Sequence, residues 1–198
     1  VYLGLLKNVL GMVNTEHYGY GELYNEINMN TGGITPGISL FPDENDSAKI
    51  RAALGIQVRT LYDKIGYCFR MIGEILFTSD LDQEKRLLEI IKKLRSRLLA
   101  QLNSAGSVTA AVRGMSYESP AYLFQDSISG IGFYQAVKEM EEHFEEQKET
   151  LKKKMKEILS LLIQKKNLMI SFTGEEAGLK TAEREMSSLL QQIPGEGT

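Results

Sequence analysis

Two adjacent apolar stripes at helical spacing mark the first segment of the chain. One stripe consists of Leu3, Leu6, Leu10 and Val13, and the other of Tyr2, Leu5, Val9 and Met12. Because side chains three and four residues apart share a helix face, the two stripes predict a helix buried on much of its circumference. A shorter apolar pattern predicts a second helix over residues 22–27, and the sequence Thr31-Gly32-Gly33 is typical of a helix end.

The next segment alternates between apolar and polar positions. In residues 50–58 the large apolar side chains occupy every second position, with Arg51 among the residues between them. A period of two predicts a strand with one apolar face. Residues 34–41 predict a preceding strand, irregular or at a sheet edge because it contains Pro36. A short polar loop separates the two strands, so we expect an antiparallel hairpin.

Helical patterns dominate the rest of the chain. They predict helices over residues 65–76, from about 82 to 102, from about 121, and from 133 to about 162 with a break near 147–150. Alternation in residues 168–172 predicts a final strand, and a last helix follows up to about Ile193. The sequence therefore predicts a helix-rich α+β fold with helices packed on one face of an antiparallel sheet.

Composition narrows the class of protein. The chain has 198 residues, of which 42% are hydrophobic and 25% charged, as in globular proteins. The formal net charge of -3 favours neither nucleic acid nor an anionic membrane as a partner. No apolar run approaches the roughly 18 residues of a membrane span. We expect a cytoplasmic protein, and the start at Val1 inside a helical pattern suggests a piece of a longer polypeptide.

Residues able to carry chemistry are sparse. The single cysteine, Cys68, lies between Tyr67 and Phe69, which indicates a core thiol. The two histidines, His17 and His143, are far apart, and neither has a second histidine at helical spacing. We interpret His17 as a loop residue and His143 as an exposed helix residue. The sequence contains no nucleophile elbow and no phosphate-binding loop.

One run lies close to a metal motif. In His143-Phe-Glu-Glu-Gln147, glutamine occupies the place of the second histidine of an inverted zinc motif, and glutamine is a poor zinc ligand. We interpret this run as coincidental. The predicted sets of catalytic, cofactor-binding and metal-binding residues in this chain are therefore empty.

The first predicted helix has the frame of a metal-binding helix without the ligands. Leu5, Asn8 and Val9 stand where His-x-x-Glu-His would place two histidines and a glutamate, and Thr15 and Tyr18 follow. Leucine and valine cannot coordinate zinc, and an asparagine amide cannot act as a general base.

The later motifs keep the order found in a known family. They comprise Glu22, Leu23, Ile27 and residues 31–34, then Ser107, Ala110, Arg113, Phe124 and residues 127–134, and finally residues 167–171 with Gly174. In this order the chain resembles the pitrilysin/insulinase-type zinc metalloproteases, and their presequence-protease branch in particular. The resemblance covers roughly residues 1–193.

The resemblance implies a parent enzyme whose two halves close around a chamber. Zinc and the glutamate that activates water would lie in the N-terminal half, while the C-terminal half repeats the fold without metal. This chain resembles the start of the metal-free half. Residues 1–145 would form a degenerate domain of the mitochondrial-processing-peptidase type without its first strands, and residues 146–198 would open the next unit. Glu84 or Glu89 falls where a distant zinc ligand would lie, but we expect a surface acid.

The expected function is that of a non-catalytic domain in the wall of a closed peptide-degrading chamber. Its expected partners are the catalytic N-terminal half of the same polypeptide and unfolded peptides, with Zn²⁺ held by the other half. Nucleic acid and membranes are not expected partners, and the chain alone is predicted to be inactive. Two alternatives remain open. One is a stand-alone interaction module, possibly homodimeric, and the other is a hydrolase that uses His143 and Glu146.

Overall fold

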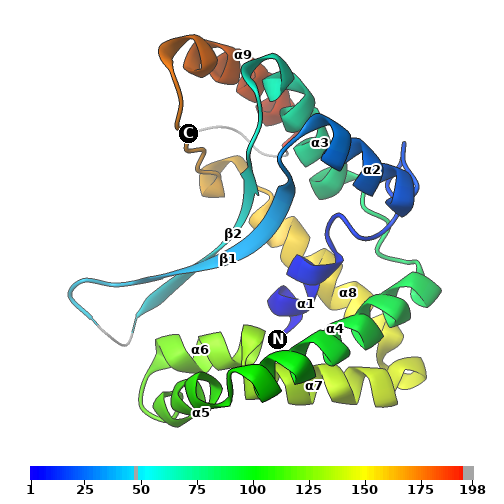
Figure 1. Cartoon of the computed structure of the whole chain (residues 1–198), viewed down its shortest axis with the longest axis vertical. Helices are drawn as coiled ribbons and strands as arrows, with labels where there is room; N and C mark the ends of the chain where they lie inside the picture. Colours follow the sequence, from blue (N-terminus) through cyan, green and yellow to red (C-terminus); the bar gives the residue numbers. More distant parts are fainter. Residues whose placement is uncertain (47–48, 194–198) are drawn as a thin grey trace. The chain divides into compact units, whose positions relative to one another are not determined.

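The computed structural model describes residues 1–46 and 49–193, which form a helix-rich α+β fold, as predicted (Figure 1). The strands are β1 (Ile34–Pro42) and β2 (Ile50–Val58). The α-helices are α1 (Tyr2–Val9), α2 (Tyr20–Asn30), α3 (Ile65–Phe77), α4 (Glu84–Ser104), α5 (Gly106–Met115), α6 (Pro120–Ser129), α7 (Ile131–Glu142), α8 (Phe144–Leu162) and α9 (Glu176–Gln192). Short 3₁₀ turns, η1 (Tyr62–Lys64) and η2 (Lys165–Asn167), precede α3 and follow α8.

The two strands pair as the predicted antiparallel hairpin. The amide of Gly32 donates to the carbonyl of Arg59 at 2.7 Å, and the amide of Asp43 donates to the carbonyl of Lys49 at 3.0 Å. Along β2 the exposed positions alternate with half-buried ones over most of the strand, which confirms the period of two. No described residue of either strand is fully buried.

The end of α2 follows from its sequence. The hydroxyl of Thr31 donates to the carbonyl of Ile27 at 2.7 Å and accepts a hydrogen bond from the amide of Gly33 at 3.0 Å. Gly33 has a φ of 108°, a conformation that side chains with a Cβ disfavour. The predicted helix end at these residues is confirmed, and the chain turns there into β1.

The chain divides into two compact units, each with its own core. The first takes its described residues from the ranges 1–9, 37–55 and 81–155. Within it α4 packs against α7, α6 packs against α5 and α7, and α1 packs against α4 and α6. Its fully buried side chains include Leu5, Leu6, Val9, Leu87, Ile91, Phe133, Val137, Leu151 and Met155. The apolar stripe predicted along α4 is therefore the core face of this unit.

The second unit takes its described residues from the ranges 10–36 and 56–80 and from residue 156 onward. Within it α3 packs against α9. Its buried side chains include Val13, Leu23, Ile65, Cys68, Met71, Ile75, Ala182, Leu189 and Ile193. Both units take residues from several parts of the sequence, and the predicted division into 1–145 and 146–198 stays a prediction.

Two details of the helices differ from the sequence patterns. The long helix predicted from residue 133 breaks at His143, not near 147–150, and His143 has non-helical backbone angles of φ -116° and ψ 32°. Residues 107–112, which carry only a weak pattern, lie in α5, and α5 packs against α6. Packing of this kind stabilises a short helix even where valine and threonine lower its intrinsic preference.

The predicted strand over residues 168–172 is wrong. These residues have no regular secondary structure, and Met169 is 87% exposed. A strand needs a hydrogen-bonded neighbour, and the sheet within the described residues consists of β1 and β2 alone. The alternating pattern was present, but the partner strand was not.

Candidate functional site

Helix α1 contains the metal-binding frame, and the two positions that correspond to the zinc-binding histidines are buried in the core. Leu5 and Val9 lie in α1 and are both 0% exposed. The helix approaches its neighbours closely at Gly4, where an added Cβ would lie 2.9 Å from Phe133 and 3.0 Å from the carbonyl oxygen of Ile128. Side chains buried at this density hold the helix by apolar contact. These two positions therefore offer no metal ligand.

Asn8 stands at the position that corresponds to the glutamate of the frame, and its side-chain amide forms two hydrogen bonds. Its Nδ2 donates to the carbonyl oxygen of Gly4 at 2.7 Å, one helical turn earlier. Its Oδ1 accepts a short hydrogen bond from Nη2 of Arg97 in α4. The amide thus joins α1 to α4 and has no basic atom with which to activate water.

The charge around this frame also opposes a metal cation. Lys7 directly precedes Asn8 and is half-buried. Its pKa is lowered, first by burial and then by the nearby positive charge of Arg97. A zinc site needs anionic or neutral donors, whereas this surface presents two cations. The residues present do not fit zinc.

Two acids that sequence reasoning considered as distant ligands form ion pairs. The carboxylate of Glu84, at the start of α4, accepts hydrogen bonds from Nζ of Lys148 at 2.8 Å and from Nζ of Lys152 at 3.0 Å. Both lysines lie in α8. These hydrogen bonds lower the pKa of Glu84 to about 2. Glu89 pairs with Arg86 at 2.9 Å on the exposed side of α4. Both acids act as helix-surface acids, and Glu84 additionally links two helices.

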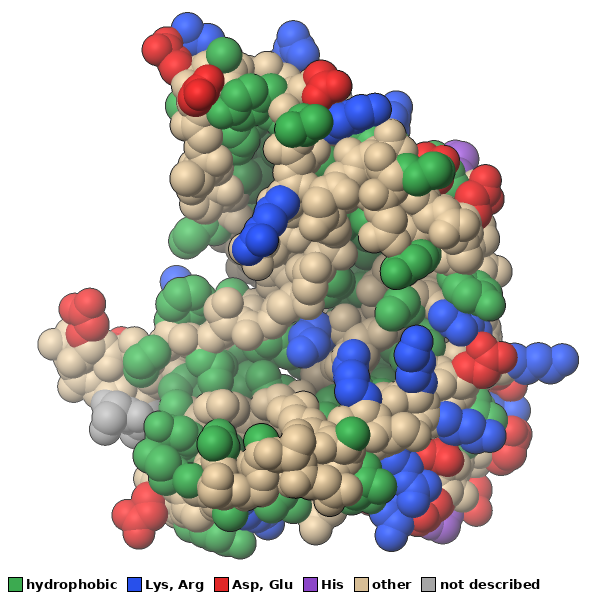
Figure 2. All heavy atoms as spheres, in the orientation of Figure 1, with side chains coloured by type: hydrophobic (Ala, Val, Ile, Leu, Met, Phe, Trp, Pro, Cys, Tyr) green, Lys and Arg blue, Asp and Glu red, His purple; other side chains and the backbone are tan. Residues whose placement is uncertain are grey.

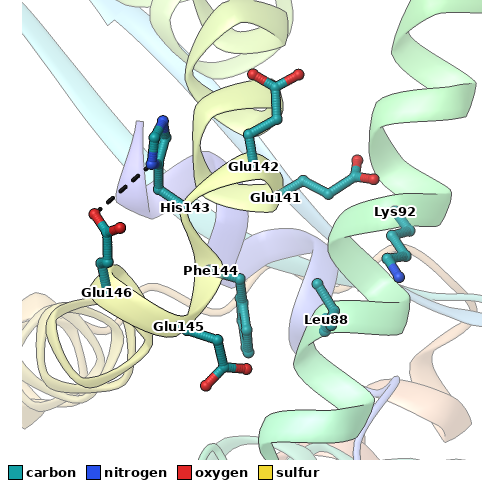
Figure 3. A pocket seen from close by; sticks show the side chains of 8 residues that line it. All are labelled: Leu88, Lys92, Glu141, Glu142, His143, Phe144, Glu145 and Glu146. Carbon is teal, nitrogen blue, oxygen red and sulfur yellow. Dashed lines mark ion pairs between the residues drawn. The ribbon is translucent and has the colours of Figure 1, made fainter.

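His143 lies at the corner between α7 and α8. Its Nδ1 is 3.7 Å from Oε2 of Glu146, and both side chains are more than half exposed, at 53% and 79%. Figure 3 shows these two facing each other, while Glu141 extends toward α4, which carries Leu88 and Lys92. Because the helix breaks at His143, the histidine precedes the first turn of α8. The run therefore lacks the continuous helix that an inverted zinc motif needs.

His17 contacts a carboxylate that sequence reasoning missed. The backbone amide of His17 donates to Oε1 of Glu74 at 2.9 Å, and its ring Nδ1 lies 3.0 Å from Oε2. Burial alone would raise the pKa of Glu74, but hydrogen bonds from Thr15, His17 and Thr78 outweigh it, so the pKa is lowered. A glutamate within the apolar stretch of α3 was the available signal, since buried acids are rare without partners.

Cys68 lies in the core of the second unit, as predicted. It is 4% exposed, and burial raises the pKa of its thiol despite a hydrogen bond that involves Thr60. A protonated, covered thiol is a poor nucleophile. Among residues 1–46 and 49–193, no group of three or more His, Cys, Asp or Glu side chains is arranged to hold a metal ion. No helix in these ranges has the length and apolar character needed to cross a membrane.

Comparison with known proteins decides the family. Residues 1–140 match the family model of a domain associated with peptidases of family M16, subfamily C. The chain belongs to this family. In this peptidase-associated domain the degenerate helix α1 is the first element of the matched region. The predicted resemblance to the presequence-protease branch is confirmed.

Curated relatives align along nearly the whole chain. Protein HypA of Clostridium perfringens is 30% identical over 191 residues, which is 96% of this chain and 19% of the relative. The mitochondrial presequence protease of Candida albicans is 28% identical over 97% of this chain and 19% of its own length. The mitochondrial presequence protease of Saccharomyces cerevisiae is 21% identical over 98% of this chain and 20% of its own length. The peptidase-associated domain thus spans about a fifth of the length of these relatives.

Proposed function

We propose that this chain is a non-catalytic domain of a zinc metalloendopeptidase and forms part of the wall of a closed peptide-degrading chamber. The family match and the two relatives named presequence protease support a place within a peptidase. The catalytic partner in this proposal is the N-terminal half of the same polypeptide, which would supply Zn²⁺ and the general base.

One observation carries the non-catalytic part of the proposal. The positions that would hold zinc carry Leu5 and Val9, both fully buried, and the position of the base carries Asn8, which is bonded to Arg97. These side chains hold α1 in place by burial and hydrogen bonding, and none of them can bind zinc or act as a general base. In the proposed chamber the domain contributes shape and surface, which restrict access to unfolded peptides and limit bulk water.

The test compares the chain alone with the chain joined to its catalytic half. Both proteins are incubated with zinc, their metal content is measured, and cleavage of a long unstructured peptide is followed. The proposal predicts no stoichiometric zinc and no cleavage for the chain alone, and chelator-sensitive cleavage for the joined protein. One zinc per isolated chain with chelator-sensitive cleavage would overturn it.

The same preparations test the two alternatives. A His143→Ala variant of the isolated chain addresses the hydrolase that uses His143 and Glu146, because any activity of that pair must be lost. Sedimentation of the isolated chain addresses the stand-alone module. A stable homodimer, together with failure to associate with the catalytic half, would favour that module over the chamber domain.

A further inference from the structure

Two cations lie together beside the degenerate frame. Arg97 of α4 donates to Asn8 of α1, and the residue before Asn8, Lys7, is close enough for the two charges to repel. The hydrogen bond to Asn8 uses one nitrogen of the Arg97 guanidinium. Its remaining N–H groups can still bind a carboxylate through two parallel hydrogen bonds.

A third cation extends this surface along α4. Lys93 precedes Arg97 by four residues and therefore shares its helix face. Both Lys93 and Arg97 are exposed. Figure 2 shows Lys and Arg side chains gathered over α1 and α4 near the middle of the view. We call Lys7, Lys93 and Arg97 the cationic surface.

The cationic surface lacks the carboxylates that other cations of the same unit have. Arg95 lies 3.3 Å from Glu141, and Lys148 lies 2.8 Å from Glu84. Within residues 1–46 and 49–193, by contrast, the three members of the cationic surface form no ion pair with Asp or Glu. The chain contains 26 acidic and 23 basic residues, so a shortage of acids does not explain why these three cations have no Asp or Glu partner in these ranges.

Neighbouring cations without a carboxylate gain from an anionic ligand. Both desolvation and the charge of Arg97 disfavour the half-buried ammonium of Lys7, and attraction to a bound carboxylate would offset these two costs. A polyphosphate chain is a poorer match. The net charge of the protein is -3, and nucleic-acid binding rests on neutralising many phosphates at once.

We propose that Lys7, Lys93 and Arg97 bind the acidic side chains of an unfolded peptide. The identification of the ligand as a peptide rests on the proposed function, whereas the preference for Asp and Glu rests on the cationic surface. The cationic surface lies beside the positions that would hold the zinc ligands, and it would select peptides by charge.

The test measures binding of two fluorescent peptides to the purified chain. Both are unstructured Gly/Ser peptides with amidated C-termini; one carries glutamates and the other carries glutamines at the same positions. We expect the glutamate peptide to bind more tightly, and its affinity to fall as NaCl rises from about 50 to 300 mM, since salt screens exposed charges.

Matched variants locate the binding. Lys7→Gln with Arg97→Gln should weaken binding of the glutamate peptide about tenfold, because both lost contacts are charge pairs with the ligand. Lys85→Gln with Lys92→Gln removes two charges from another face of α4 and should change affinity less than about twofold, since salt screens them from the ligand. If the first variant does not fold, Lys93→Gln tests the same surface at an exposed position.

Several outcomes would overturn the proposal. They are equal affinity for the two peptides, equal weakening by both double variants, or tighter binding of a single-stranded oligonucleotide than of the glutamate peptide. The proposed function is judged separately by cleavage in the joined protein. Cleavage without charge preference would overturn only the proposed role of the cationic surface. Absence of cleavage would overturn the proposed chamber function, while the binding result would still hold.

Discussion

The carboxylate of Asp126 lies 2.7 Å from Nη1 of Arg113, and the aspartate is only 2% exposed. Both oxygens of this carboxylate also lie 3.2 Å from the backbone nitrogen of Gly132, in the first turn of α7. One buried anion therefore joins α5, α6 and the positive end of α7.

Replacing this anion should loosen the three-helix junction. We expect Asp126→Ala to lower the free energy of unfolding by about 2 kcal/mol, because Arg113 and the amide of Gly132 lose a buried acceptor. Urea unfolding followed by circular dichroism measures the effect. Glu118→Gln is the control, since Glu118 is exposed and its substitution should change stability by less than about 0.5 kcal/mol. Equal stability of the two variants would show that the junction tolerates loss of Asp126.

The ion pairs of Glu84 make stability depend on pH. The folded pKa of about 2 lies below the ordinary value of 4.5, so the unfolded chain binds more protons between these values. The contribution of Glu84 is therefore complete above about pH 4.5 and is lost as the pH falls toward 2. We expect the stability difference between wild type and Glu84→Gln to shrink over this range and with added salt. A difference that is constant with pH would contradict this origin.

Removing the packing of Leu5 in α1 should be costly. Leu5→Ala deletes buried atoms from a fully covered site, so we expect it to lower the free energy of unfolding by about 3 kcal/mol. Leu161→Ala is the control, because Leu161 is 65% exposed and should contribute little. Thermal and urea unfolding of both variants check the prediction. A loss at Leu5 no larger than that at Leu161 would mean that α1 is not held by its core contacts.

The thiol of Cys68 should resist modification in the folded protein. Burial raises its pKa and covers the sulfur, so both the thiolate fraction and the access of reagents are low. We expect labelling by a thiol reagent to be at least about tenfold slower without urea than with it, because reaction requires local opening. Similar rates under both conditions would refute the buried position.

Local sequence patterns predicted most of the elements because their signals are periodic. The stripe on α4 and the alternation in β2 both mark the side that is packed, and both elements were found where expected. Residues 168–172 show the limit of such patterns. Their alternation expresses a strand preference, but a strand also needs a neighbour that the pattern itself cannot supply.

The candidate site was predictable only in part. That Leu5, Asn8 and Val9 cannot coordinate zinc follows from their chemistry alone. The contact between Asn8 and Arg97 joins residues 89 positions apart, and the pairing of His17 with Glu74 joins residues 57 apart. Such contacts depend on how helices pack, and helix periodicity gives the face of a residue without giving its partner.

The packing of α1 opposes the introduction of zinc ligands one at a time. A lone histidine at Leu5 or Val9 would bury an imidazole without a metal to bind, at a cost in stability. A lone glutamate in place of Asn8 would face the guanidinium of Arg97, and this ion pair would lower the basicity of its carboxylate. Neither kind of single substitution would by itself create a zinc site. Several substitutions at once, together with repacking of the surrounding core, would therefore be needed for this helix to bind zinc.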